Sequence, residues 1–231
     1  RTHADAIIAI TNSPDGRQRI EGIYGESVII VPYVMPGFRL ARLCAELYPA
    51  QARSETIGMI LLNHGVFSFG ATAQQSYERM ISLVTLAEDY LQSHHAWQVS
   101  FPEIPPRQQP IRSELASLRR DLSALAGFPL IMSSHDDPQA LGFASHPDVA
   151  ALSQQGPLTP DHVLFTKRLP LIGRGLDAYA AAYHAYFEAN QHRSELPLTM
   201  LDPAPRVILD PVFGLLTLGR TAKQALVVEG I

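Results

Sequence analysis

The stretch Met59-Ile60-Leu61-Leu62-Asn63-His64-Gly65-Val66-Phe67-Ser68-Phe69 decides the fold, because two apolar runs flank a short polar turn. Short runs rich in branched and aromatic residues are typical of strands, and Asn63-His64-Gly65 lies between the two runs. We therefore expect strands over 56–62 and 66–69. Two further strands are expected upstream, over 27–34 and over the short apolar run 6–10.

Helical periodicity separates these predicted strands. Pro36-Gly37 precedes a stretch whose apolar side chains recur every three or four residues from Phe38 to Leu47. Thr72-Ala73-Gln74-Gln75 matches a capping box, and the same periodicity continues behind it from Tyr77 to Leu91. Strands and helices that alternate in this way predict an α/β fold with helices packed on a sheet.

Residues 97–112 carry four prolines and predict a linker between two parts of the chain. We expect residues 1–96 to form one domain and residues 113–231 to form an α+β region. No internal repeat is evident. The second half is expected to contain helices over 114–126, 138–144, 147–155, 177–191 and 221–228, a strand over 128–132 and a hairpin over 206–218.

Composition excludes several classes of protein. The 231 residues are 46% hydrophobic with a net charge of −4, which favours a packed core and gives no general attraction to nucleic acid or membrane. The single cysteine, Cys44, fits a reducing compartment, so we expect a cytoplasmic protein. Because the sequence opens and closes within apolar stretches, we expect a fragment of a larger domain.

Histidines at the ends of predicted strands are the first candidate site residues. His3 precedes the predicted strand 6–10, and His64 ends the strand 56–62 and is followed by Gly65. Ligands collect at strand ends in α/β sheets, and imidazole is a common zinc ligand. The spacing alone leaves two interpretations open: His3 and His64 bind a metal together, or both histidines are structural.

Other chemistry has weaker support in the sequence. His162 lies near Lys167 and Arg168, where a helix start and a phosphate contact are both open interpretations. The chain contains no GxGxxG, no GxxxxGK[ST] and no GxSxG, so nucleotide binding and serine hydrolysis have no local motif.

Two segments resemble a known family. Thr2-His3-Ala4-Asp5-Ala6-Ile7 resembles the start of the metal motif of class II aldolases in the aldolase/adducin superfamily. Leu62-Asn63-His64-Gly65-Val66, followed by Phe69-Gly70 and a helix with Glu78, resembles the second metal motif. Further stretches, including 156–163 and 219–223, resemble the aldolase region of bacterial bifunctional rhamnulose-1-phosphate aldolase/short-chain dehydrogenase proteins.

The resemblance implies a fold, a metal and a substrate class. It implies a mixed central sheet with helices on both faces, and a zinc ion held by imidazoles that include His3 and His64. Asn63 and Gly65 would lie at the substrate, a sugar phosphate such as rhamnulose 1-phosphate. Cleavage would give dihydroxyacetone phosphate and lactaldehyde, within carbohydrate metabolism, and the protein would be a homo-oligomer.

The sequence also departs from the family pattern. Arg1 stands where the His-x-His motif has its first histidine, and the acid/base carboxylate is expected before Arg1. A dehydrogenase segment would follow residue 231. Two alternatives to an aldolase therefore stay open: a non-catalytic, adducin-like interaction module, and the aldolase-like part of a short-chain dehydrogenase protein.

Overall fold

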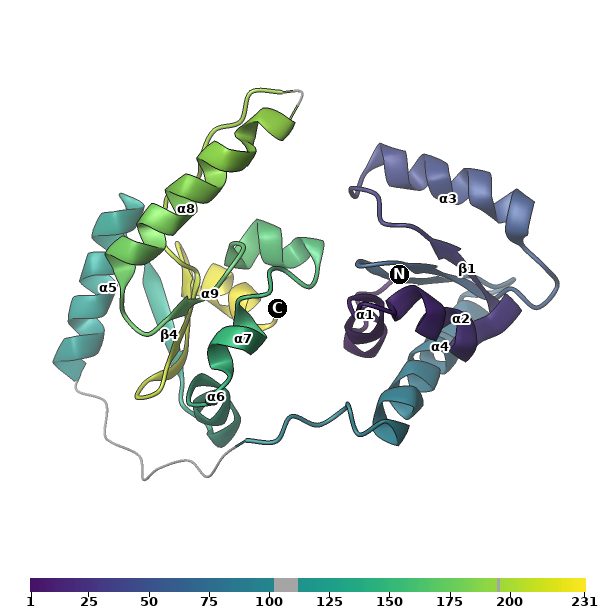
Figure 1. The fold of residues 1–231 in the computed structure, drawn as a ribbon, viewed down its shortest axis with the longest axis horizontal. Coiled ribbons are helices and arrows are strands. Elements are labelled where there is room, and N and C mark those ends of the chain that lie inside the picture. The colour runs from purple at the N-terminus through teal and green to yellow at the C-terminus, as the bar shows by residue number, and fades with distance from the viewer. Residues whose placement is uncertain (102–111, 195) are drawn as a thin grey trace. The chain divides into compact units, whose positions relative to one another are not determined.

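The computed structural model describes residues 1–101, 112–194 and 196–231, which form two compact units (Figure 1). The first unit comprises residues 1–99 and 158–160, and the second comprises residues 100–157 and 161–231. Most of the predicted linker 97–112, namely 102–111, lies outside the described residues. Among the helices that are described, none combines the length and apolar character that a membrane span requires.

The first unit is built on a three-stranded mixed sheet in the order β1-β2-β3. Strand β1 runs parallel to β2, whereas β2 and β3, both predicted as strands, form an antiparallel hairpin. The elements are α1 (Asp5–Thr11), α2 (Gly16–Tyr24), η1 (Gly25–Ser27), β1 (Val28–Val31), α3 (Phe38–Gln51), β2 (Gly58–Leu61), β3 (Gly65–Ser68) and α4 (Ala73–Ser93).

Both faces of this sheet are covered by helices (Figure 1). Val28 and Ile60 pack in one cluster with residues of α1, α2 and α4, whereas Ile29 and Met59 pack in another with residues of α3. Alternate side chains of a strand point to opposite faces, so a continuous apolar strand needs cover on both sides. The α/β class with a mixed sheet and helices on both faces is confirmed.

The predicted strand over 6–10 is wrong, because these residues form helix α1. Ile7 and Ile10 are at most 2% exposed, and the exposed position between them holds the apolar Ala9, so the run has no polar face that separates helix from strand. The Asn12 amide and the Ser13 hydroxyl donate to carbonyls of the helix, at 2.9 Å to Ile8 and 2.7 Å to Ile10. These side chains satisfy carbonyls that the helix end leaves open.

The second unit contains a four-stranded sheet in the order β4-β7-β6-β5. Only β5 and β6 are parallel; β7 is antiparallel to both β6 and β4. The elements are α5 (Arg112–Ala126), β4 (Ile131–His135), α6 (Pro138–Ala144), α7 (Val149–Ser153), η2 (His162–Thr166), β5 (Leu171–Ile172), α8 (Leu176–Asn190), η3 (Gln191–Arg193), β6 (Val207–Asp210), β7 (Gly214–Gly219) and α9 (Ala222–Glu229). The strand predicted over 128–132 lies three residues later, as β4.

The two units have the same order of secondary-structure elements, although no repeat is evident in the amino-acid sequence. A strand, a helix, a parallel strand, a hairpin return and a capped helix follow one another as β1-α3-β2-β3-α4 and as β5-α8-β6-β7-α9. Thr72 and Thr221 each accept the N–H of the glutamine three residues later, at 3.1 and 3.2 Å. The helix starts are therefore built in the same way.

The hairpin turn of the second unit is held by a buried carboxylate. Asp210 accepts the backbone N–H groups of Val212 at 2.8 Å and Phe213 at 3.0 Å, and it pairs with Arg174 at 2.7 Å. Burial raises the pKa of Asp210, but these hydrogen bonds outweigh it and hold that pKa below its ordinary value. The ionised form is thus the one that the fold stabilises.

We expect Asp210→Asn to lower the free energy of unfolding of the second unit by about 1–3 kcal/mol at pH 7, because an amide would face Arg174 with the charge removed. Because the pKa of Asp210 is lower in the folded than in the unfolded state, the ionised carboxylate stabilises the fold fully above the unfolded-state pKa. This stabilisation is lost as the pH falls through the folded-state pKa. The difference in the free energy of unfolding between wild type and Asp210→Asn should therefore shrink below about pH 4.

Urea titrations at pH 7 and pH 3, read from amide-exchange protection of residues 207–219, measure this effect. Asp148→Asn is the matched control, since Asp148 is exposed and its side chain caps no backbone N–H. A difference between wild type and Asp210→Asn that is the same at both pH values would contradict the assignment.

Candidate metal site

The predicted turn between β2 and β3 holds His64 inside the first unit. Asn63 takes a left-handed backbone conformation with φ of 58°, which asparagine tolerates better than most residues. The N–H of His64 then donates to the Leu61 carbonyl at 3.1 Å, and the residue is only 2% exposed. The imidazole is therefore fixed by a tight turn on the core of the sheet.

A single residue pairing brings His3 to this turn. Thr2 and Val66 exchange two backbone hydrogen bonds, at 3.1 and 3.0 Å, along the free edge of β3. Gly65 makes the approach possible: its φ is +151°, and a Cβ there would collide with the Thr2 carbonyl oxygen and lie 3.1 Å from Cδ2 of His3. Only glycine accepts both the conformation and the contact.

The two imidazole rings consequently lie together. Their centroids are 5.1 Å apart, with 45° between the ring planes. Rings that share one tetrahedral ion, with zinc–nitrogen distances of about 2.0–2.1 Å, have centroids about 5 Å apart. As a donor set, two imidazoles at this separation fit part of a zinc site.

Two further observations limit the fit. The Arg1 guanidinium contacts Nε2 of His3 directly, and a fixed positive charge there opposes a cation. Within residues 1–101, 112–194 and 196–231, no group of three His, Cys, Asp or Glu side chains is placed to hold a metal. The described residues therefore supply two of the expected imidazoles.

The other two predicted site residues shape the turn. The Asn63 amide donates to the Asn12 side chain at 2.8 Å, and the Asn63 backbone N–H donates to the Thr11 hydroxyl at 3.3 Å. Asn63 thus anchors the turn to the end of α1, while Gly65 provides clearance for Thr2. Their roles toward a substrate remain predictions.

Comparison with known proteins identifies the class. A family model described as "Class II Aldolase and Adducin N-terminal domain" matches residues 2–91, and one described as "Aldolase class II, second domain" matches residues 110–231. The second match alone covers more than half of the chain. The chain belongs to the class II aldolase/adducin family.

Particular relatives match different shares of the chain. The "Uncharacterized oxidoreductase YuxG" of Bacillus subtilis (strain 168) is 31% identical over 95% of this chain, which spans 34% of that relative. The N-terminal class II aldolase domain of a conserved Thermoplasma acidophilum protein is 37% identical over 38% of this chain and 39% of its own, with a TM-score of 0.34. An aldolase II superfamily protein of Pseudomonas syringae is 19% identical over 53% of this chain and 54% of its own, with a TM-score of 0.32.

We expect Gly65→Ala to weaken the pairing of Thr2 with Val66, because the added methyl would meet the Thr2 carbonyl in a strained conformation. The cost should be about 1–3 kcal/mol in the free energy of unfolding of the first unit. NMR hydrogen exchange at the Val66 amide, which donates to Thr2, reports the pairing directly.

Gly22→Ala is the matched control, since Gly22 lies in α2 with no heavy atom within 4 Å of a built Cβ. That change should be neutral or slightly stabilising, because alanine favours a helix over glycine. Unchanged protection of Val66 in Gly65→Ala would show that the edge pairing does not depend on Gly65.

Proposed function

We propose that this chain supplies His3 and His64 to the metal site of a zinc-dependent class II aldolase. The observation that carries the proposal is the 5.1 Å approach of the two rings, one of them buried in the turn between β2 and β3. Membership of the class II aldolase/adducin family supports it. The reaction would be retro-aldol cleavage of a ketose 1-phosphate such as rhamnulose 1-phosphate, giving dihydroxyacetone phosphate and lactaldehyde.

The residues of the chain would act mainly by holding nitrogen donors in place. A bound zinc ion supplies Lewis acidity toward carbonyl and hydroxyl oxygens of the substrate. His64 is held by its turn, and His3 is held by the pairing of Thr2 with the edge of β3. Donors fixed before the metal arrives need no ordering at the moment of binding.

The partners of such an enzyme belong to the same proposal. We propose a sugar phosphate as the substrate and a homo-oligomer as the assembly, as in the family that the sequence resembles. A cytoplasmic location is supported by cysteine usage, because the single cysteine, Cys44, is free.

One observation favours a second function, a non-catalytic, adducin-like interaction module. The Arg1 guanidinium contacts Nε2 of His3, one of the two nitrogens through which this imidazole could bind an ion. A cation held at this nitrogen opposes a metal there, while the fold is kept. The two functions differ in one measurable property, which is metal affinity.

A third possibility concerns a longer protein. The Bacillus relative is named an uncharacterized oxidoreductase, and this chain spans about a third of it. We propose that the chain corresponds to the aldolase-like part of a protein that also carries a short-chain dehydrogenase. Redox chemistry would then belong to segments outside the matched third.

Metal titration separates the aldolase from the module. We expect the chain to bind one zinc or cobalt ion, with visible bands of Co²⁺ that report imidazole ligation. His64→Gln and His3→Ala should each weaken binding at least about tenfold, or 1.4 kcal/mol, because each removes a donor. Arg1→His should tighten binding, since it exchanges a cation for a donor.

His184→Ala, which removes an exposed imidazole on α8, is the control and should leave affinity unchanged. Circular dichroism verifies that the buried-site variants fold. Cleavage of rhamnulose 1-phosphate is then assayed with the same set of proteins. Failure of both wild type and Arg1→His to bind either metal would overturn the aldolase proposal in favour of the module.

A further inference from the structure

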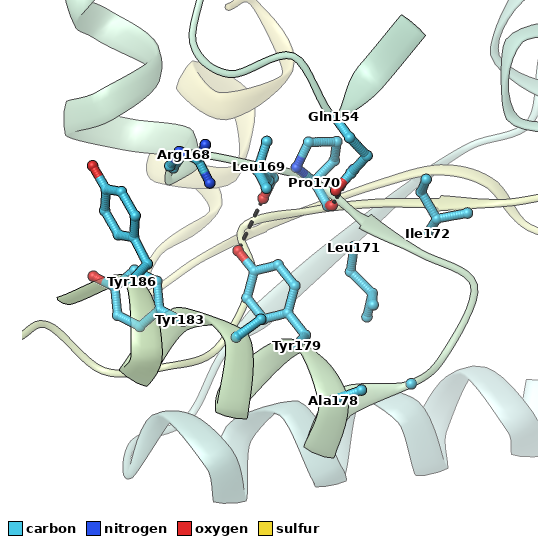
Figure 2. A pocket seen from close by; sticks show the side chains of 12 residues that line it. Gln154, Arg168, Leu169, Pro170, Leu171, Ile172, Ala178, Tyr179, Tyr183 and Tyr186 are labelled. Carbon is cyan, nitrogen blue, oxygen red and sulfur yellow. Dashed lines mark hydrogen bonds between the residues drawn. The ribbon is translucent and has the colours of Figure 1, made fainter. Parts of the chain in front are cut away.

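The second unit contains a pocket that is separate from the two histidines. It lies between the segment 168–172 and helix α8 and has a volume of about 350 Å³ (Figure 2). Clefts that bind small molecules begin at about this size and are mostly apolar with a few placed polar groups. The lining follows that description, because aliphatic and tyrosine side chains dominate it.

Three tyrosines of α8 form one wall of the pocket. Tyr179, Tyr183 and Tyr186 follow one another at helical spacing, and Tyr179 points toward Leu169 of the segment 168–172 (Figure 2). The Tyr179 hydroxyl donates to the Leu169 carbonyl at 2.9 Å, and the Gln154 amide donates to the Pro170 carbonyl at 3.0 Å. These bonds satisfy two backbone carbonyls of the opposite wall. Tyr183 and Tyr186 line the same pocket, and each ring has a cation near it.

Positive charge lies at the end of this tyrosine row. The Arg168 guanidinium is centred 4.7 Å from the Tyr186 ring. The neighbouring arginines Arg174 and Arg206 are paired with carboxylates, but no ion pair in the described part of the unit includes Arg168. A guanidinium stacked on an aromatic ring keeps its donors available for a carboxylate or a phosphate.

A second cation lies behind the same wall. The ammonium of the buried Lys167 is 4.3 Å from the centre of the Tyr183 ring and donates to the Asp202 carbonyl. Burial lowers the pKa of Lys167 to about 8, so this residue is still mostly charged at neutral pH.

The backbone of Lys167 has a strained conformation. Its φ of 68° and ψ of 175° fall in a region that is essentially restricted to glycine. A glycine would relieve the strain but would remove the buried ammonium. Strained non-glycine residues of this kind cluster at ligand-binding and catalytic positions.

We propose that this pocket binds a small organic anion with a flat apolar body. Its carboxylate or phosphate group would lie against the Arg168 guanidinium, and its body would lie against the rings of Tyr183 and Tyr186. The aromatic wall selects for the body, and the cations select for the charge. This site does not rest on the aldolase proposal, because it shares no residue with the histidine pair.

Calorimetric titration with phenyl phosphate tests the proposal on the whole chain. We expect one molecule to bind per chain, with amide-exchange protection centred on residue 154 and residues 167–186. Inorganic phosphate and benzyl alcohol, which each carry half of the ligand, should bind at least about tenfold more weakly. Benzoate in place of phenyl phosphate shows whether a carboxylate is accepted as well as a phosphate.

Arg168→Gln should weaken phenyl phosphate at least about tenfold, because it removes the charged donor. Tyr186→Ala should weaken it by about two- to tenfold through the lost ring contact. Arg120→Gln is the control: it removes the same charge from a side chain that is 73% exposed and should change affinity less than twofold.

The proposal is overturned by any of four results. These are no saturable binding of phenyl phosphate or benzoate, equal binding of inorganic phosphate, equal loss in Arg168→Gln and Arg120→Gln, or protection only outside residues 154 and 167–186. A His64→Gln variant that loses metal but binds phenyl phosphate normally would show that the two sites bind their ligands independently.

Discussion

Two hydrogen bonds between Thr2 and Val66 hold the histidine pair together, and the geometry of the site depends on them. They place Thr2 as a one-residue partner on the edge of β3 that does not face β2, and so cover part of that edge. Edges of sheets need such cover to avoid pairing with other chains. In this unit the covering residue also carries the next one, His3, to the ring of His64.

The features predicted correctly from the sequence are those decided by local chemistry. The two strands that flank Asn63-His64-Gly65 and the cap at Thr72 follow from local apolar runs and a capping residue, and both formed as predicted. The helical state of the run 6–10 is not evident from the sequence because its exposed position holds the apolar Ala9, which leaves no polar face to reveal the period. Here packing against α2 and α4, rather than propensity, decides the structure.

The candidate sites differ in how much of them a sequence can reveal. His64 stands out because a glycine and two apolar runs frame it. Its neighbour His3 depends on an edge pairing between residues far apart in sequence, which no local pattern reports. The tyrosine spacing at 179, 183 and 186 is visible in the sequence, but the wall opposite is not. That pocket exists only because segment 168–172 passes beside α8.

The repeated order of elements makes the second unit an internal reference for the first. Gly214 begins β7 as Gly65 begins β3, and a Cβ on either would strike a carbonyl of the neighbouring segment, from His135 or Thr2. Strand β4 takes, beside β7, the place that Thr2 takes beside β3. In this second copy of the hairpin, Asp210 ties the turn to its own backbone, and no imidazole stands between Asp210 and Gly214. Both hairpins therefore have a glycine at the start of the second strand and a partner on its edge, but only one has a histidine in the turn. The fold of the hairpin does not require His64.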